Sequence, residues 1–338
     1  SQVERARRDA LAATREFVAW LEEQAPSKTG PSGVGKENYT WYQRHVHLVP
    51  LSWEQQVDLL QRELARAHAA LRLEEARNHE LPPLPVIGSA DEYTQRANAA
   101  VTRYLDFLAA RELIDIEPYM DPALRARLGG FVPLEQRNFF AIATHYEPLT
   151  LYTHFYHWWD LARMREQPHA SAIRRGPLLY NIWDSRAEGM ATGMEEMMMH
   201  AGLYDAQPRA REIVWIMLAQ RAARGLGSLY AHANEFTLKQ AKDFHVAWTP
   251  RGWMREDLDL LGFEQLLYLR QPGYGTSYVV GKYQVERLLM ERARQQGADF
   301  TMRGFFAELD AAGLVPMSLI RWQLTGEDDE VKAMLRSP

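Results

Sequence analysis

The stretch YTHFYHWWD, residues 152–160, is the most informative part of this sequence. It places His154 and His157 one helical turn apart. The segment DSRAEG, residues 184–189, carries two carboxylates with a similar one-turn spacing. Side chains three or four positions apart share one face of an α-helix. The two segments therefore predict two packed helices that hold a site of two histidines and a carboxylate between them.

The rest of the chain has the apolar spacing of helices nearly throughout, and few segments show the alternation of a strand. Residues 2–24 form an amphipathic segment. Three helix starts have the spacing of a capping box, in which Ser or Thr precedes Glu or Gln by three positions. These pairs are Ser52 with Gln55, Ser89 with Glu92, and Thr237 with Gln240. We predict an all-α, multi-helix fold with the site between central helices.

A proline-rich break divides the predicted helices. Pro82, Pro83 and Pro85 punctuate the chain there. We therefore predict an N-terminal helical region over residues 1–85 and a helical catalytic-like region over residues 86–338. With 338 residues the chain has ample length to bury a large core, so one continuous domain is the alternative.

The composition narrows the classes of partner. A net charge of −5 without a block of Lys or Arg does not indicate nucleic-acid binding. No apolar run approaches the length of a membrane span. Cysteine is absent, which excludes disulfides and thiolate ligands, so a metal site must use His, Asp and Glu. The composition leaves the compartment and the oligomeric state open.

The histidine and carboxylate segments together offer a metal site. His154, His157 and Glu188 supply imidazole nitrogens and a carboxylate oxygen, which are the donors that zinc takes. A divalent ion there would acidify a water molecule or polarise a substrate carbonyl. Asp160 continues the histidine face, and Glu195 repeats the Glu188 face two turns later. The alternative is structural, with core histidines and carboxylates paired to nearby arginines, because an i, i+3 His pair is less specific than His-Glu-x-x-His.

Four motifs are similar to those of one known family. They are GVGKENY at residues 33–39, EGMA at residues 188–191, the segment 224–241, and PGYGTSYVVGK at residues 272–282. Through them the chain resembles the bacterial domain-of-unknown-function family 885, a relative of gluzincin-type metallopeptidases. The last motif, Pro-Gly-x-x-x-x-Tyr-x-x-Gly, is the most specific. The resemblance covers the C-terminal part of a typical, longer member.

The resemblance implies a mostly helical metallohydrolase with a divalent metal, zinc in the first place, and a small-molecule or peptide-like substrate. Glu188 would be the carboxylate ligand. Tyr278 and His232 would stabilise an oxyanion, a role that needs donors aimed at developing negative charge. Arg224 would hold a substrate carboxylate in a bidentate manner.

One segment departs from the family pattern, which has His-Glu-x-x-Pro-Gly-His-His. His157 fits the second family histidine, and this leaves Leu151 and Tyr152 at the positions of the first His and the Glu. His154 can then substitute as a ligand from the same helical face. An alternative register places residues 145–147, His-Tyr-Glu, at the His-Glu pair.

The departure leaves the general base open, with Glu147, Asp160 and Glu195 as candidates. We expect a metal-dependent hydrolase of an amide, peptide-like or small carbonyl substrate. The alternatives are a metal-dependent lyase or isomerase on a small carbonyl compound, and an inert ligand-binding member. Tyr156 and Trp158 are candidates for binding an apolar or aromatic substrate, although half of the aromatic side chains of a helix face the core in any case.

Overall fold

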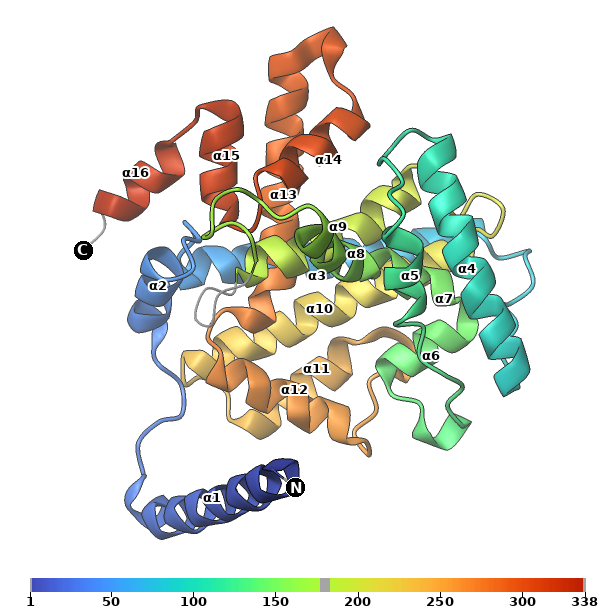
Figure 1. The fold of residues 1–338 in the computed structure, drawn as a ribbon. Coiled ribbons are helices and arrows are strands. Elements are labelled where there is room, and N and C mark those ends of the chain that lie inside the picture. The colour runs from blue at the N-terminus through green and yellow to red at the C-terminus, as the bar shows by residue number, and fades with distance from the viewer. Residues whose placement is uncertain (1, 177–182, 337–338) are drawn as a thin grey trace.

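Every regular element is a helix in the part of the chain that the computed structural model describes, residues 2–176 and 183–336 (Figure 1). This confirms the all-α, multi-helix prediction. The α-helices are α1 (Gln2–Gln24), α2 (Lys36–His45), α3 (Trp53–Arg77), α4 (Ala90–Ala110), α5 (Met120–Arg125), α6 (Phe139–Tyr146), α7 (Pro148–Tyr152), α8 (Tyr156–Glu166), α9 (Asp184–His200), α10 (Ala210–His232), α11 (Leu238–Trp248), α12 (Asp259–Arg270), α13 (Tyr274–Gln296), α14 (Met302–Ala311), α15 (Met317–Thr325) and α16 (Asp329–Arg336). The 3₁₀ turns are η1 (Ala25–Ser27), η2 (Leu134–Gln136), η3 (Thr153–Phe155), η4 (Pro250–Gly252) and η5 (Gly297–Asp299).

The three predicted helix starts are present. Ser52 and Thr237 form complete capping boxes at α3 and α11, each exchanging two hydrogen bonds with the glutamine three positions on. At α4 the Ser89 side chain accepts from the backbone N–H of Glu92. The Glu92 carboxylate instead accepts from the backbone of Gly88, at 3.0 Å. Short-range hydrogen-bond chemistry thus fixed these boundaries locally.

The centre of the molecule is α10, which is buried along almost its whole length. α3 and α11 pack along it, and α13 crosses it and continues along α9. Figure 1 shows α10 in yellow in the middle of the body, with α8 and α9 above it. The buried Arg221 and Arg224 of α10 pair with Glu195 on α9 and Glu264 on α12, so the neighbouring helices enclose its charged side chains as well as its apolar ones.

α9 and α13 approach each other closely at a pair of glycines. A Cβ atom added to Gly189 would lie 2.3 Å from the backbone of Gly281, and one added to Gly281 would lie 1.9 Å from the carbonyl oxygen of Ser185. Only residues without a side chain allow this separation. The contact places Glu188, the neighbour of Gly189, against the first turns of α13.

The residue before α13 is Gly273, its N-cap, whose φ of 95° is in the left-handed region. A Cβ atom there would also meet the Gln43 side chain, at 2.1 Å. The glycine of the Pro-Gly motif therefore permits both the turn and the contact with α2.

α1 stands apart from the body and is joined to it by a single connection (Figure 1). None of its residues is buried, and Phe17, Trp20 and Leu21 are exposed. The connection is fixed at its far end, where Gly33 hydrogen-bonds to Asn234 and the Gly35 N–H donates to a carbonyl at the end of α10. The first family-like motif is therefore a docking point for the chain in this fold.

The two regions predicted from the proline break share one core. α3, from the region 1–85, packs along α10, and its Leu60 and Leu64 belong to the same buried cluster as Leu226. The prolines lie in the connection between α3 and α4. The boundary at residue 85 stays a prediction.

None of the described helices combines the length and apolar character that crossing a bilayer requires.

Candidate metal centre

The two predicted histidine ligands lie on either side of a break between helices. α7 ends directly before η3, which contains His154, and α8 begins directly after it with His157 in its first turn. The stretch 152–160 is therefore not one continuous α-helix, which corrects the expectation of a single helical face. Side chains three positions apart nearly eclipse one another in a 3₁₀ turn, so the two imidazoles still point the same way.

These imidazoles converge on one oxygen of the predicted carboxylate ligand. The Nε2 atoms of His154 and His157 lie 3.3 and 3.0 Å from Oε2 of Glu188. One ligand atom from each of the three residues lies within 4.8 Å of the others. A tetrahedral zinc ion with bonds of about 2.0–2.1 Å separates its ligand atoms by about 3.3 Å. The donor types and their spacing therefore fit a divalent ion of this kind.

A second carboxylate fixes the orientation of His154. Its Nδ1 atom lies 2.9 Å from Oε1 of Glu195, and the same oxygen accepts from Arg221 at 2.5 Å. Burial lowers the pKa of His154, but the carboxylates of Glu188 and Glu195 outweigh it and raise the pKa above its usual value. A proton on Nδ1 leaves Nε2 free for the ion, as in the carboxylate–histidine–metal arrangements of other proteins.

Glu188 is held from its other side by tyrosines of α13. The hydroxyl of Tyr274 donates to Oε1 of Glu188 at 2.8 Å, and that of Tyr278 reaches Tyr274 at 3.3 Å. Burial raises the pKa of Glu188, but the imidazoles of His157 and His154 outweigh it and hold the pKa well below its usual range. The carboxylate is thus charged, with one oxygen committed to a tyrosine and the other facing the imidazoles.

A cavity of about 400 Å³ opens beside this group. Its polar lining residues are Asp160, Asp184, Gln271 and the mutually contacting group of His157, Glu188 and Tyr274, which we call its polar end. Its apolar walls include Trp158, Leu161, Met164, Leu267 and Leu314.

Asp184 also lines the cavity, one turn before Glu188 on α9. It is buried, with 7% of its surface exposed. Burial, and then the charge of Glu188, raise the pKa of Asp184 to about 7. Within residues 2–176 and 183–336, Asp184 has no ion-pair or side-chain hydrogen-bond partner.

The other predicted carboxylates are engaged elsewhere. Glu147 caps α7 by accepting from the backbone N–H of Leu149 at 3.2 Å. Asp160 lines the cavity, but its two oxygens accept from Arg163 at 2.7 Å and Arg186 at 3.1 Å. Asp160 therefore forms the structural ion pairs with arginine that the sequence offered as the alternative, and Glu147 is a helix cap.

Arg224 and His232 lie deeper along α10. The Arg224 guanidinium pairs with Glu264 at 2.8 Å and stacks over the Tyr278 ring, 3.9 Å from its centroid. His232 is the last residue of α10, with Nε2 3.0 Å from the carbonyl oxygen of Tyr268. Neither is among the described residues that line the cavity.

Of the two predicted aromatic contacts, Trp158 lines the cavity and Tyr156 does not. The Tyr156 hydroxyl hydrogen-bonds to Asp310 on α14, and its ring is buried. The Arg127 guanidinium lies over the Trp158 ring, 4.3 Å from its centroid.

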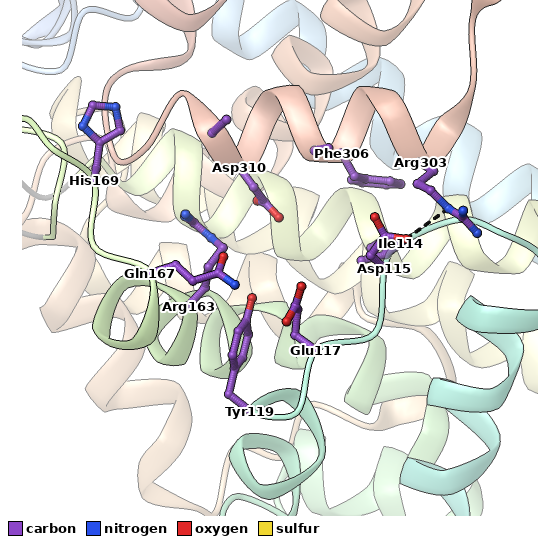
Figure 2. Close-up of a pocket in the computed structure, with 12 residues that line it drawn as sticks. Ile114, Asp115, Glu117, Tyr119, Arg163, Gln167, His169, Arg303, Phe306 and Asp310 are labelled. Atoms are coloured by element: carbon purple, nitrogen blue, oxygen red, sulfur yellow. Dashed lines mark ion pairs between the residues drawn. The ribbon is translucent and has the colours of Figure 1, made fainter.

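A second cavity, of about 290 Å³, lies beside α14 (Figure 2). Figure 2 shows Arg163 and Glu117 directed toward the space beneath Asp310, and Arg303 joined to Asp115 by an ion pair of 3.2 Å. Basic and acidic side chains are mixed around it. No member of the histidine–glutamate group is among its described lining residues.

The sequence did not single out Tyr274, and it indicated Asp184 only as one of the two carboxylates of the segment 184–189. Tyr274 lies one turn before Tyr278 on α13, and this spacing alone could have indicated it. The cavity position of Asp184 depends on how α8, α9 and α12 meet, which no local pattern reports.

No family model matches the chain, and no curated protein matches its sequence. Solved structures that share the fold include two putative lipoproteins. One is a putative lipoprotein of unknown function from Shewanella oneidensis, with a TM-score of 0.73, 16% identity, and coverage of 94% of this chain and 65% of that chain. The other is a putative lipoprotein from Colwellia psychrerythraea, with a TM-score of 0.68, 16% identity, and coverage of 91% and 58%. The chain spans less than two thirds of either neighbour, and the family resemblance stays a prediction.

Proposed function

We propose that this chain is a metal-dependent hydrolase that cleaves an amide, a peptide-like bond or another small carbonyl substrate. One observation carries the proposal. Donor atoms of His154, His157 and Glu188 come within 4.8 Å of one another beside a cavity, although they arise from separate elements. A divalent ion held there would polarise a substrate carbonyl and acidify water.

The surrounding residues support a preorganised centre. Glu195 holds the His154 ring by its Nδ1 atom, and Tyr274 holds the outer oxygen of Glu188. Such partners fix the direction of the ligand atoms before the ion arrives.

Asp184 is the residue that we propose as general base. It lines the cavity one turn from Glu188 and has no partner among the described side chains, whereas Glu147, Asp160 and Glu195 are committed to backbone or arginine partners. In this position it takes a proton from water that attacks the substrate. It thereby supplies the carboxylate that the family-like segment lacks, and such a base contributes about 10²–10⁴-fold.

The tyrosine pair favours a second candidate, a lyase or isomerase on a small carbonyl compound. Tyr274 lines the cavity and is hydrogen-bonded to Tyr278, so a phenol next to the ion can exchange a proton with a substrate. Tyr278 was the predicted oxyanion donor, and in this arrangement Tyr274 is the nearer of the two to the cavity.

Metal analysis of the purified protein tests the centre. We expect about one divalent ion per chain by inductively coupled plasma mass spectrometry, and loss of it in His157→Ala and in Glu188→Ala. The matched control is His79→Ala, which lies at an exposed position just after the end of α3 and should retain the ion. A metal-free parent protein under metal-replete conditions would refute the proposal and leave the inert ligand-binding alternative.

The two reaction classes separate in labelled water. The metal-loaded protein is incubated in H₂¹⁸O with panels of amides, esters and small carbonyl compounds, and products are read by mass spectrometry. Hydrolysis places ¹⁸O in the carboxylate product. If a carbonyl compound is consumed and no product gains a carboxylate that contains ¹⁸O, the reaction is that of a lyase or an isomerase.

A further inference from the structure

The cavity beside the histidine–glutamate group has a strongly apolar wall. Trp158 and Leu161 from α8, Leu267 from α12 and Leu314 from the connection before α15 face it from different elements. These side chains are far apart in the sequence, so their convergence is not a by-product of one amphipathic helix. Burying a bulky apolar group against such a wall favours binding by removing apolar surface from water.

The cavity has the size of a small-molecule site. Its volume of about 400 Å³ lies in the lower part of the range for ligand pockets, about 300–1,000 Å³. That space holds one aromatic or branched aliphatic group together with the bond to be cleaved.

The charged groups of the cavity select against anions. Asp160, Asp184 and Glu188 line it, and no Lys or Arg is among the described lining residues. Asp160 is compensated by its two arginines, and Glu188 by the imidazoles. A ligand carboxylate in the apolar part would lose its hydration without gaining a cationic partner. The arginine clamp expected at Arg224 is engaged by Glu264 instead.

We propose that this cavity is the specificity pocket of the site and binds the aromatic or branched aliphatic group of an electrically neutral substrate. The bond to be cleaved then lies at the polar end, next to His157 and Glu188. This inference rests on the proposed function for the reaction, but the pocket itself can be tested without turnover.

Three hydroxamic acids test the pocket in the zinc-loaded protein by isothermal titration calorimetry. Acetohydroxamic acid carries only the chelating head, phenylacetohydroxamic acid adds an aromatic group, and succinic acid monohydroxamate adds a carboxylate of similar reach. We expect the aromatic compound to bind about tenfold or more tightly than acetohydroxamic acid, and the anionic one to bind no better than acetohydroxamic acid. Equal affinities, or tightest binding of the anion, would overturn the pocket while leaving the metal centre in place.

Two substitutions locate the binding of the aromatic group. Leu161 is 46% exposed and Leu267 is partly exposed, so Leu161→Asp and Leu267→Ala should leave the fold intact. Both should reduce the preference for phenylacetohydroxamic acid at least threefold and leave acetohydroxamic acid unchanged. Leu73→Asp, on the exposed face of α3, is the control and should change neither affinity. An unchanged preference in both pocket variants would contradict the assignment.

A metal-independent arm keeps the two proposals distinguishable. Binding of 2-phenylacetamide, which carries the aromatic group without a chelator, is measured by ligand-observed NMR on protein treated with EDTA. We expect saturable binding that Leu161→Asp weakens and Leu73→Asp does not. If 2-phenylacetamide binds but the purified protein contains no metal, the pocket is supported and the proposed metal-dependent function is refuted. If 2-phenylacetamide does not bind but the purified parent protein contains zinc, the pocket is refuted and the metal centre is supported.

Discussion

At the scale of single residues, Glu195 is the least obvious part of the proposed metal centre. It is not among the described residues that line the cavity, and its Oε1 atom contacts both the Nδ1 side of His154 and the Arg221 guanidinium. Its neighbour Glu196 points to the other side of α9, where it pairs with Arg66 at 2.6 Å and Lys282 at 2.9 Å. Two adjacent buried glutamates on one helix therefore have different tasks, and this offers a matched comparison.

We expect Glu195→Gln to weaken zinc binding about 10- to 100-fold, because an amide holds the imidazole less strongly than a carboxylate does. Glu196→Gln removes a buried charge from the same helix without touching His154 or His157; Glu196 contacts His200 instead, at 3.3 Å. It should lower the melting temperature but leave the zinc affinity unchanged. Competition with a chromophoric chelator gives both affinities, and equal weakening in the two variants would mean that the effect is merely structural.

Asp184 should make the stability of the metal-free protein depend on pH. Its pKa of about 7 in the folded chain lies above the value of 3.8 for an unperturbed carboxyl, since burial and then Glu188 disfavour its charge. The folded state therefore binds this proton more tightly, and the stabilisation present at low pH is lost as the pH rises toward 7. The full effect is of the order of 4 kcal/mol.

Asp184→Asn should accordingly remove part of the decline in unfolding free energy between about pH 4 and pH 7, and make the metal-free protein more stable than the parent at pH 8. Urea denaturation at several pH values in EDTA measures this. Asp58→Asn, at an exposed position of α3, should follow the parent protein. A parallel pH profile for Asp184→Asn and the parent would show that this carboxyl does not titrate in that range.

At the scale of elements, the site depends on how closely α9 and α13 approach. Gly189→Ala would add a methyl group whose carbon lies only 2.3 Å from backbone atoms of Gly281. We expect a loss of about 1–3 kcal/mol from overpacking, and weaker zinc binding because Glu188 moves with its neighbour.

Gly193→Ala provides the control one turn further along α9. There the nearest atom to the new methyl group is the flexible end of Met197, at 3.1 Å. The better helix propensity of alanine, about 1 kcal/mol, should offset that contact. Denaturant unfolding measures the stability of both variants, and zinc titration measures their affinity for the ion. If Gly193→Ala cost as much as Gly189→Ala, the close approach of the two helices would not be the reason.

α1 should be dispensable for the stability of the body. None of its residues is buried, and the anchoring hydrogen bond of Gly33 lies beyond its end. Deleting residues 1–27 should change the unfolding free energy by no more than about 0.5 kcal/mol, as surface changes generally do. Leu60→Ala, in the buried face of α3, should instead cost about 2–5 kcal/mol. A large loss on deletion would show that α1 packs against the body.

At the scale of the whole molecule, the proposed centre joins the adjacent elements η3 and α8 to α9 and α13, which follow later in the chain. An ion bound there would stabilise the folded state relative to the unfolded chain, by about 2.7 kcal/mol at a concentration 100 times the dissociation constant. We expect zinc to raise the melting temperature of the parent protein and not of Glu188→Ala. An equal rise in both would place the ion elsewhere.

Much of the fold could be predicted because its signals are local. Apolar spacing and the caps at Ser52, Ser89 and Thr237 depend on residues within one or two turns, and they gave the all-α class and three helix starts. The break at η3 was missed, because the run 152–160 has the spacing of a continuous helix.

The candidate site divides in the same way. Sequence spacing and the family resemblance named His154, His157 and Glu188, since each lies in a recognisable local pattern. The same reasoning could not separate Asp184 from Asp160 or Tyr274 from Tyr278, because the members of each pair differ only in what lies opposite them.

The sequence by itself thus determined the helical class, because hydrogen bonding and apolar periodicity act over short distances along the chain, and it named the candidate donor residues of the proposed centre. Only the tertiary structure decided which carboxylates are free. Arg163 and Arg186 form ion pairs with Asp160, and Arg221 forms one with Glu195. Asp184 lines the cavity and has no such partner among the described side chains. The availability of a buried charge depends on its neighbours in space, and these are set by the packing of helices that are distant in the chain.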